Sequence, residues 1–149
     1  MIEGKNLSKK YGDLEVLKSV DVSIAQGEIV SITGPSGAGK STLLQLLGTL
    51  DAPLGGKVEY DGLEVTSLSP KKMAQFRNEN IGFIFQFHHL LPEFTAIENV
   101  SMPAFIKGMP KKDAEIRASE LLQMLGLGHR LEHKPNELSG GEQQRVAVA

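Results

Sequence analysis

The feature that most constrains the fold of this chain is a glycine-rich segment at residues 34–41, which reads GPSGAGKS. It matches the pattern G-x-x-x-x-G-K-[ST], in which a strand leads into a phosphate-binding loop and the loop opens a helix. The apolar, β-rich run 29–33 precedes the segment and predicts a strand buried on both faces. Apolar residues at helical spacing follow it and predict an amphipathic helix: Leu43, Leu46, Leu47 and Leu50. The segment therefore favours an α/β fold.

The residue types in this segment suit the binding of an anion. Glycines allow successive backbone N–H groups to turn inward, and a helix that begins at Lys40 adds its positive N-terminus. Lys40 supplies a mobile cation for the β and γ phosphates, and the Ser41 hydroxyl can ligate Mg²⁺. A glycine-rich turn without function is the alternative, and the flanking strand and helix disfavour it. We predict an ATP or GTP site formed by Gly34, Pro35, Ser36, Gly37, Ala38, Gly39, Lys40, Ser41 and Thr42.

The rest of the chain predicts strands first and helices later. Residues 19–24 alternate apolar and polar side chains, as a half-buried strand does, and residues 57–60 before Asp61-Gly62 indicate a hairpin strand and its turn. The run 81–85 predicts a second buried strand. Later residues share one helical face, with Gly126 placed to end that helix: Ala114, Ala118, Leu121, Leu122 and Leu125. A further helix is expected to begin near Ser139.

The composition excludes several classes of function. The chain has 149 residues and no cysteine, which rules out a disulfide scaffold, thiol catalysis and Cys-ligated metal sites. Its net charge of −2 gives no general attraction to nucleic acid, and we expect no nucleic-acid partner. No apolar run approaches the roughly 20 residues of a membrane span. We expect the chain to reach a membrane only through a partner.

Three further motifs resemble those of the ATP-binding cassette (ABC) transporter ATPases. Residues 138–145, LSGGEQQR, resemble the LSGGQ signature of that family. Phe85-Gln86 resembles the end of its Q-loop strand, and Tyr11-Gly12 resembles its adenine-stacking segment. The motifs stand in the family's order, and all of residues 1–149 fall within it. The resemblance implies an α/β P-loop NTPase core with an N-terminal antiparallel β region, a helical subdomain and an incomplete parallel sheet.

The resemblance also implies a role for each matching residue, with ATP as the nucleotide. Tyr11 holds adenine, Lys40 and Gln86 serve catalysis, and Ser41 and Gln86 hold Mg²⁺. Alone, Tyr11 could be a core aromatic, Gln86 a polar strand end and Ser139 a helix N-cap. A helix N-terminus with a hydroxyl is, however, a second anion site. The signature residues would reach the γ-phosphate held by the other subunit of a head-to-tail homodimer: Ser139, Gly140, Gly141 and Glu142, the last where the family often has glutamine.

A narrower resemblance lies in residues 86–100, QFHHLLPEFTAIENV, which are similar to the ATPase subunits of bacterial lipoprotein-releasing exporters. It implies an ATPase subunit bound peripherally at the cytoplasmic face of the inner membrane, through ABC transporter transmembrane subunits. We expect residues 87–109 to form the docking surface for such a subunit. The adjacent His88 and His89 are not expected to bind a metal, because neighbours on a helix do not face each other.

Three alternatives remain open on the sequence alone. One is a macrolide-type efflux ATPase, and the membrane protein that co-purifies would distinguish it. Another is a soluble ABC protein that acts on ribosomes or DNA repair complexes, although such proteins usually carry duplicated cassettes and basic surfaces. The third is a nucleotide-binding module without catalysis.

The sequence stops at Ala149 with no helix stop signal. The family resemblance places the Mg²⁺-binding aspartate, the general base and the sensor histidine after the signature, and none of them is present. We therefore expect a fragment that binds ATP, does not hydrolyse it alone, and has low stability or self-associates. Its expected parts are an α/β nucleotide-binding core at 1–86, a helical subdomain at 87–137, and the signature with the start of a helix at 138–149.

Overall fold

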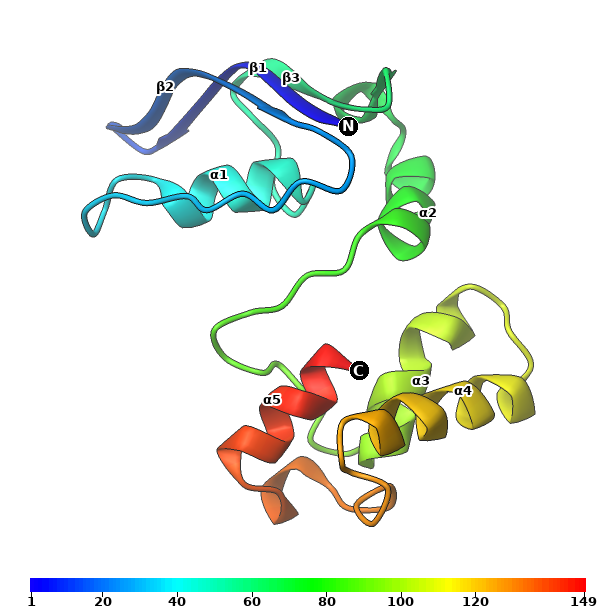
Figure 1. Ribbon diagram of the computed structural model, residues 1–149. Coiled ribbons are helices and arrows are strands. Elements are labelled where there is room, and N and C mark those ends of the chain that lie inside the picture. The colour runs from blue at the N-terminus through cyan, green and yellow to red at the C-terminus, as the bar shows by residue number, and fades with distance from the viewer. The chain divides into compact units, whose positions relative to one another are not determined.

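The computed structural model describes all residues 1–149 and contains two compact units, Met1–Arg77 and Asn78–Ala149 (Figure 1). The first unit carries the strands and one complete helix: β1 (Ile2–Tyr11), β2 (Leu14–Ile24), α1 (Lys40–Leu47), β3 (Gly55–Tyr60) and β4 (Leu63–Glu64). A 3₁₀ turn at Val65–Ser67 and most of α2 (Pro70–Asn80) complete it. The second unit contains α3 (Ala96–Ile106), α4 (Lys111–Met124), a 3₁₀ turn at Pro135–Glu137 and α5 (Gly140–Val148). The predicted division of the chain into parts at 1–86, 87–137 and 138–149 stays a prediction.

The strands form one antiparallel sheet in the order β2-β1-β3-β4. Ile2 pairs with Ile24 on β2 and with Tyr60 on β3, so β1 lies between the two. Asp61 and Gly62 join β3 to β4, and both have positive φ angles, 47° and 82°, as a tight hairpin turn requires. The predicted strand at 19–24 and the predicted hairpin are confirmed.

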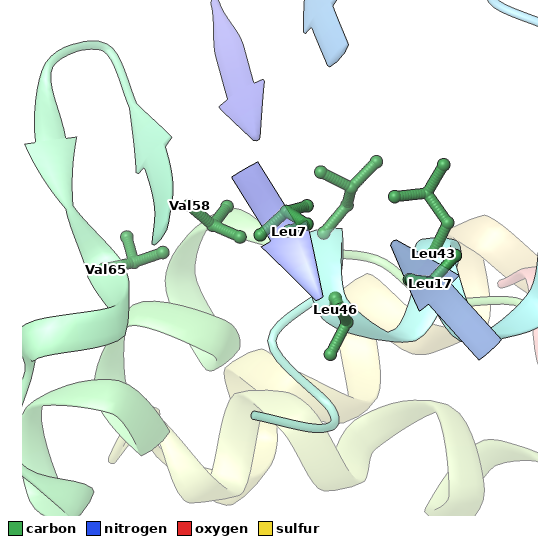
Figure 2. Packing of buried hydrophobic residues seen from close by; sticks show 7 residues of the cluster. Leu7, Leu17, Leu43, Leu46, Val58 and Val65 are labelled. Carbon is green, nitrogen blue, oxygen red and sulfur yellow. The ribbon is translucent and has the colours of Figure 1, made fainter. Parts of the chain in front are cut away.

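The helix α1 packs its leucines against this sheet. Figure 2 shows the resulting core, in which leucines of the helix meet Leu7, Leu17 and Val58 of three strands. The predicted helix is confirmed, with Leu43, Leu46 and Leu47 buried. Leu50 was predicted on the same face, but it is 39% exposed, because the helix has already ended at the C-cap Gly48.

Two predicted buried strands, 29–33 and 81–85, are wrong. Neither segment has strand structure; Ile29 is 98% exposed and Ile84 57% exposed. A strand of this type needs hydrogen-bonded neighbours on both sides. The four strands of the sheet pair only with each other, and all pairs are antiparallel, so these segments have no strand to pair with. Phe85 instead packs its ring against Phe83 and lies in a T-shaped arrangement with the His89 ring.

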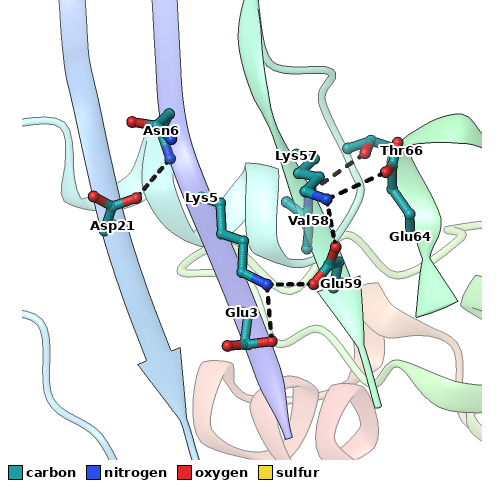
Figure 3. A network of polar contacts seen from close by, with 9 residues as sticks. All are labelled: Glu3, Lys5, Asn6, Asp21, Lys57, Val58, Glu59, Glu64 and Thr66. Carbon is teal, nitrogen blue, oxygen red and sulfur yellow. Dashed lines mark hydrogen bonds and ion pairs between the residues drawn. The ribbon is translucent and has the colours of Figure 1, made fainter. Parts of the chain in front are cut away.

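Charged side chains cross the polar face of the sheet in a short network (Figure 3). The Lys5 ammonium lies 2.6 Å from the Glu59 carboxylate and 3.2 Å from that of Glu3. Lys57 contacts Glu59 from the other side at 2.8 Å. The hydrogen bonds from Lys5 first, and then from Lys57, lower the pKa of Glu59 to about 2.

This network predicts an acid-sensitive contribution to stability. The depressed pKa of Glu59 means that its contribution is present above pH 4.5 and is lost as the pH falls towards 2. A Glu59→Gln chain should therefore lose less stability than the unchanged chain over that interval. Urea unfolding at a series of pH values measures this slope, with Glu15→Gln on β2 as a control. Parallel slopes for the unchanged and Glu59→Gln chains would contradict the assignment.

The second unit packs its helices around an apolar cluster of five buried residues: Ala96, Leu122, Leu127, Leu138 and Val146. The predicted face of α4 is confirmed, with Ala114, Ala118 and Leu122 buried, and Gly126 follows the helix with a φ of 74°. Thr95 and Glu98 form a reciprocal capping box at the start of α3. No helix of either unit combines the length and the apolar character that a membrane crossing requires.

Candidate functional site

The last position of the glycine-rich loop before α1, residue 39, accommodates only glycine. Gly39 caps α1 with a φ of 87°, a conformation that costs other residues energy. A Cβ atom at Gly39 would lie 2.9 Å from Cδ2 of Leu17 and 3.1 Å from the carbonyl oxygen of Val16. The end of the loop therefore packs closely against β2, and α1 begins at the next residue, Lys40.

Lys40 begins α1 and reaches back across the loop. Its ammonium donates hydrogen bonds to the carbonyl oxygens of Gly34 at 2.9 Å and Pro35 at 2.7 Å. These bonds hold the cation at the mouth of the loop, next to the N–H groups at the start of the helix. Positive charge from the side chain and from the helix N-terminus thus meets in one place.

The loop forms one wall of a cavity of about 380 Å³, within the size range of small-molecule sites. Tyr11, Leu14 and Val16, from the hairpin of β1 and β2, form the other wall. The wall from the loop and α1 consists of Ser36, Gly37, Gly39, Lys40, Ser41 and Thr42. The structure thus brings Tyr11 together with most of the predicted phosphate-binding residues. An aromatic side chain and a cationic glycine-rich loop suit a ligand with a flat ring and an anionic tail.

The signature residues lie at the N-terminus of α5, in the second unit. Ser139 is the N-cap of this helix, and Ser139, Gly140 and Gly141 are exposed. The Glu142 carboxylate accepts hydrogen bonds of 2.8 Å from both the N–H and the hydroxyl of Ser139. Its other oxygen accepts from the Arg130 guanidinium at 3.0 Å. Glu142 therefore fixes the position of the Ser139 hydroxyl at an exposed helix N-terminus.

The environment of Glu142 also sets its charge. The hydrogen bonds from Ser139 first, and then from Arg130, lower the pKa of Glu142 to about 2. The sequence pattern Ser-x-x-Glu signals this capping box. No sequence pattern predicts the contact of this carboxylate with Arg130, which lies twelve residues before Glu142.

Gln86 lies in the second unit and is exposed. Two residues later, Nδ1 of His88 lies 2.7 Å from Oε1 of Gln144 on α5. The segment after Gln86 is therefore tied to the helix that carries the signature. Tyr11 and the glycine-rich loop belong to the first unit.

The sequence matches the model of the family described as ABC transporter over residues 17–149. The chain therefore belongs to the ABC transporter family and is an ATP-binding cassette. Membership of this family implies nucleotide binding.

Among its relatives, the chain is 59% identical to the lipoprotein-releasing system ATP-binding protein LolD of Bacteroides fragilis (strain YCH46), covering all of this chain and 69% of that protein. It is 57% identical to the protein of the same name from Porphyromonas gingivalis (strain ATCC BAA-308 / W83), covering all of this chain and 68% of that protein.

Solved structures agree with the fold. The ATP-binding cassette MJ0796, in a dimeric post-hydrolysis state bound to ADP and Pi, superposes with a TM-score of 0.91 at 43% identity. That match covers 99% of this chain and 67% of the other. The ABC ATPase fold, with its antiparallel N-terminal sheet and helical part, is confirmed.

Proposed function

We propose that this chain is the ATP-binding subunit of a bacterial ABC system that releases lipoproteins from the inner membrane, driven by ATP hydrolysis in the full-length protein. The cavity shared by Tyr11 and the glycine-rich loop carries the nucleotide part of this proposal. Identity of 57–59% over all 149 residues to proteins named for lipoprotein release supports the transport part.

ATP occupies the cavity with its base on the Tyr11 ring, since a flat aromatic surface stacks well on another. Its phosphates lie in the loop, where backbone N–H groups next to Gly37 and Gly39 and the N-terminus of α1 stabilise their charge. Lys40 pairs with the terminal phosphates, and Thr42, which lines the same cavity, adds a hydroxyl.

Mg²⁺ fits the donors available at this site. Mg²⁺ prefers oxygen ligands and keeps several waters, so few protein oxygens are required. The exposed hydroxyl of Ser41 lines the cavity and is the proposed protein ligand in this unit. Gln86 belongs to the second unit, and its role as a further ligand stays a prediction of the family resemblance. When bound, the ion supplies charge neutralisation for the β and γ phosphates.

The second unit contributes to partner binding. The exposed N-terminus of α5 contacts the γ-phosphate bound by the other subunit of a head-to-tail homodimer, through Ser139, Gly140 and Gly141. Exposed apolar side chains in the segment 87–109 dock a membrane subunit at the cytoplasmic face of the inner membrane: Phe87, Leu91, Phe94, Ile106 and Met109, with Phe87 73% and Ile106 70% exposed.

Depletion of the protein in its own bacterium tests the transport part. We expect lipoproteins that normally leave the inner membrane to remain there, because no ATP-driven step releases them. Membrane fractionation measures the shift, and mass spectrometry of detergent extracts identifies the membrane protein that co-purifies. Unchanged lipoprotein distribution together with co-purification of a drug-efflux subunit would instead support the macrolide-type alternative.

A further inference from the structure

Tyr11 is the last residue of β1, and its side chain is tethered at the hydroxyl end. The residue is 47% exposed, so packing alone does not fix the ring. Its hydroxyl donates a hydrogen bond of 2.9 Å to Oδ2 of Asp51, forty residues along the chain. This bond ties the Tyr11 ring, which lines the cavity, to the segment that follows α1.

Asp51 is itself held in place from several directions. The Lys9 ammonium donates to its Oδ1 at 2.6 Å and to the carbonyl oxygen of Ala52 at 2.7 Å. The backbone N–H of Ala52 donates to the same Oδ1 at 2.7 Å. The segment is also anchored to β1, because the N–H of Leu54 donates to the carbonyl oxygen of Ser8 at 2.8 Å. The carboxylate is therefore a fixed acceptor.

Lys9 also contacts the Tyr11 ring itself. Lys9 and Tyr11 are two apart on β1 and so share a face of the strand. The ammonium lies 5.2 Å from the centre of the Tyr11 ring, within the range of a cation–π contact. Because Lys9 lies over one face of the ring, the opposite face remains for a nucleotide base.

The charges in this group support one another. The hydrogen bond from Lys9 lowers the pKa of Asp51, so the carboxylate stays ionised. The hydrogen bond to Asp51 raises the pKa of Tyr11, so the phenol stays protonated and remains a donor. Thr42 acts on the pKa of Tyr11 in the opposite direction, and its effect is smaller than that of Asp51.

We propose that Asp51 is a positioning residue for the nucleotide base: held by Lys9, it fixes the Tyr11 ring through the phenol hydroxyl, and thereby strengthens binding of adenine but not of phosphate. This inference rests on the proposed nucleotide function. An exposed ring that is already oriented loses less conformational freedom when a base stacks on it.

Nucleotide binding separates this role from a purely structural one. Affinities for Mg-ATP and for Mg-tripolyphosphate, which has no base, are measured by calorimetry for the unchanged chain and for Asp51→Asn, Tyr11→Phe and the double variant. We expect each single change to weaken ATP binding roughly 3- to 10-fold, the effect of one net hydrogen bond. The double variant should be no weaker than either single one, because each change removes the hydrogen bond that the phenol hydroxyl donates to a carboxylate oxygen. Tripolyphosphate affinity should not change.

The outcomes that overturn the inference differ from those that overturn the proposed function. Unchanged ATP affinity in both single variants, or an equal loss for ATP and tripolyphosphate, refutes the positioning role alone. If the chain without any substitution binds ATP no better than tripolyphosphate, or binds neither ligand, the proposed function is contradicted. The inference about Asp51 is then contradicted as well. Asp13→Asn, which removes a nearby exposed carboxylate, is the matched control and should bind both ligands normally.

Ultraviolet titration of the phenols gives a second readout that needs no ligand. The chain has two tyrosines and no tryptophan, so phenolate absorbance reports on Tyr11 and Tyr60 only. Tyr11→Phe removes one transition and so identifies it. Asp51→Asn should move that transition to lower pH, because the raised pKa of Tyr11 depends first on Asp51. A transition that stays in place would show that the tether does not exist in solution.

Discussion

Replacement of Lys40 with alanine is expected to weaken binding of Mg-ATP roughly 10- to 100-fold, the loss of one strong charge-assisted contact of about 1.5–3 kcal/mol. Lys40 is the cation at the mouth of the loop, where its ammonium lies 2.9 Å from the Gly34 carbonyl oxygen and 2.7 Å from that of Pro35. Removal of the side chain takes away charge that the terminal phosphates need and releases the two loop carbonyls. Both effects act on the phosphate end of the ligand.

Calorimetric titration with Mg-ATP and Mg-tripolyphosphate tests this expectation. Both ligands should bind Lys40→Ala more weakly by a similar factor, in contrast to the base-specific loss expected for Asp51→Asn. Lys18→Ala removes an exposed lysine from β2 and controls for the change in net charge. Equal ATP affinity for Lys40→Ala and Lys18→Ala would exclude Lys40 from the phosphate site.

Local sequence signals predicted the elements that carry the site. The glycine pattern at 34–41 gave the loop and the start of α1 at Lys40, and Ser-x-x-Glu gave the start of α5 at Ser139. Asp61-Gly62 gave the hairpin turn. Each of these depends on dihedral preferences or hydrogen bonds within a few residues, which the sequence displays directly.

Features that depend on distant partners could not be predicted in the same way. The runs 29–33 and 81–85 have the composition of strands, but strand structure also requires neighbours, and the sheet offers none to them. The tether from Tyr11 to Asp51 joins residues forty positions apart, with no pattern in either segment that announces it. The sequence therefore placed Tyr11 in the candidate site without the group that orients it.

Leu46→Ala is expected to lower the free energy of unfolding of the first unit by about 2–5 kcal/mol, as buried leucine truncations do. Leu46 is 1% exposed and lies in the apolar core between α1 and the sheet, so its loss leaves a cavity in that core. Leu44→Ala, on the same helix but 48% exposed, is the matched control and should change stability by no more than about 0.5 kcal/mol. Both tyrosines belong to Met1–Arg77, so tyrosine fluorescence in a urea titration follows this unit alone. Equal unfolding midpoints for the two variants would show that α1 does not pack on the sheet through Leu46.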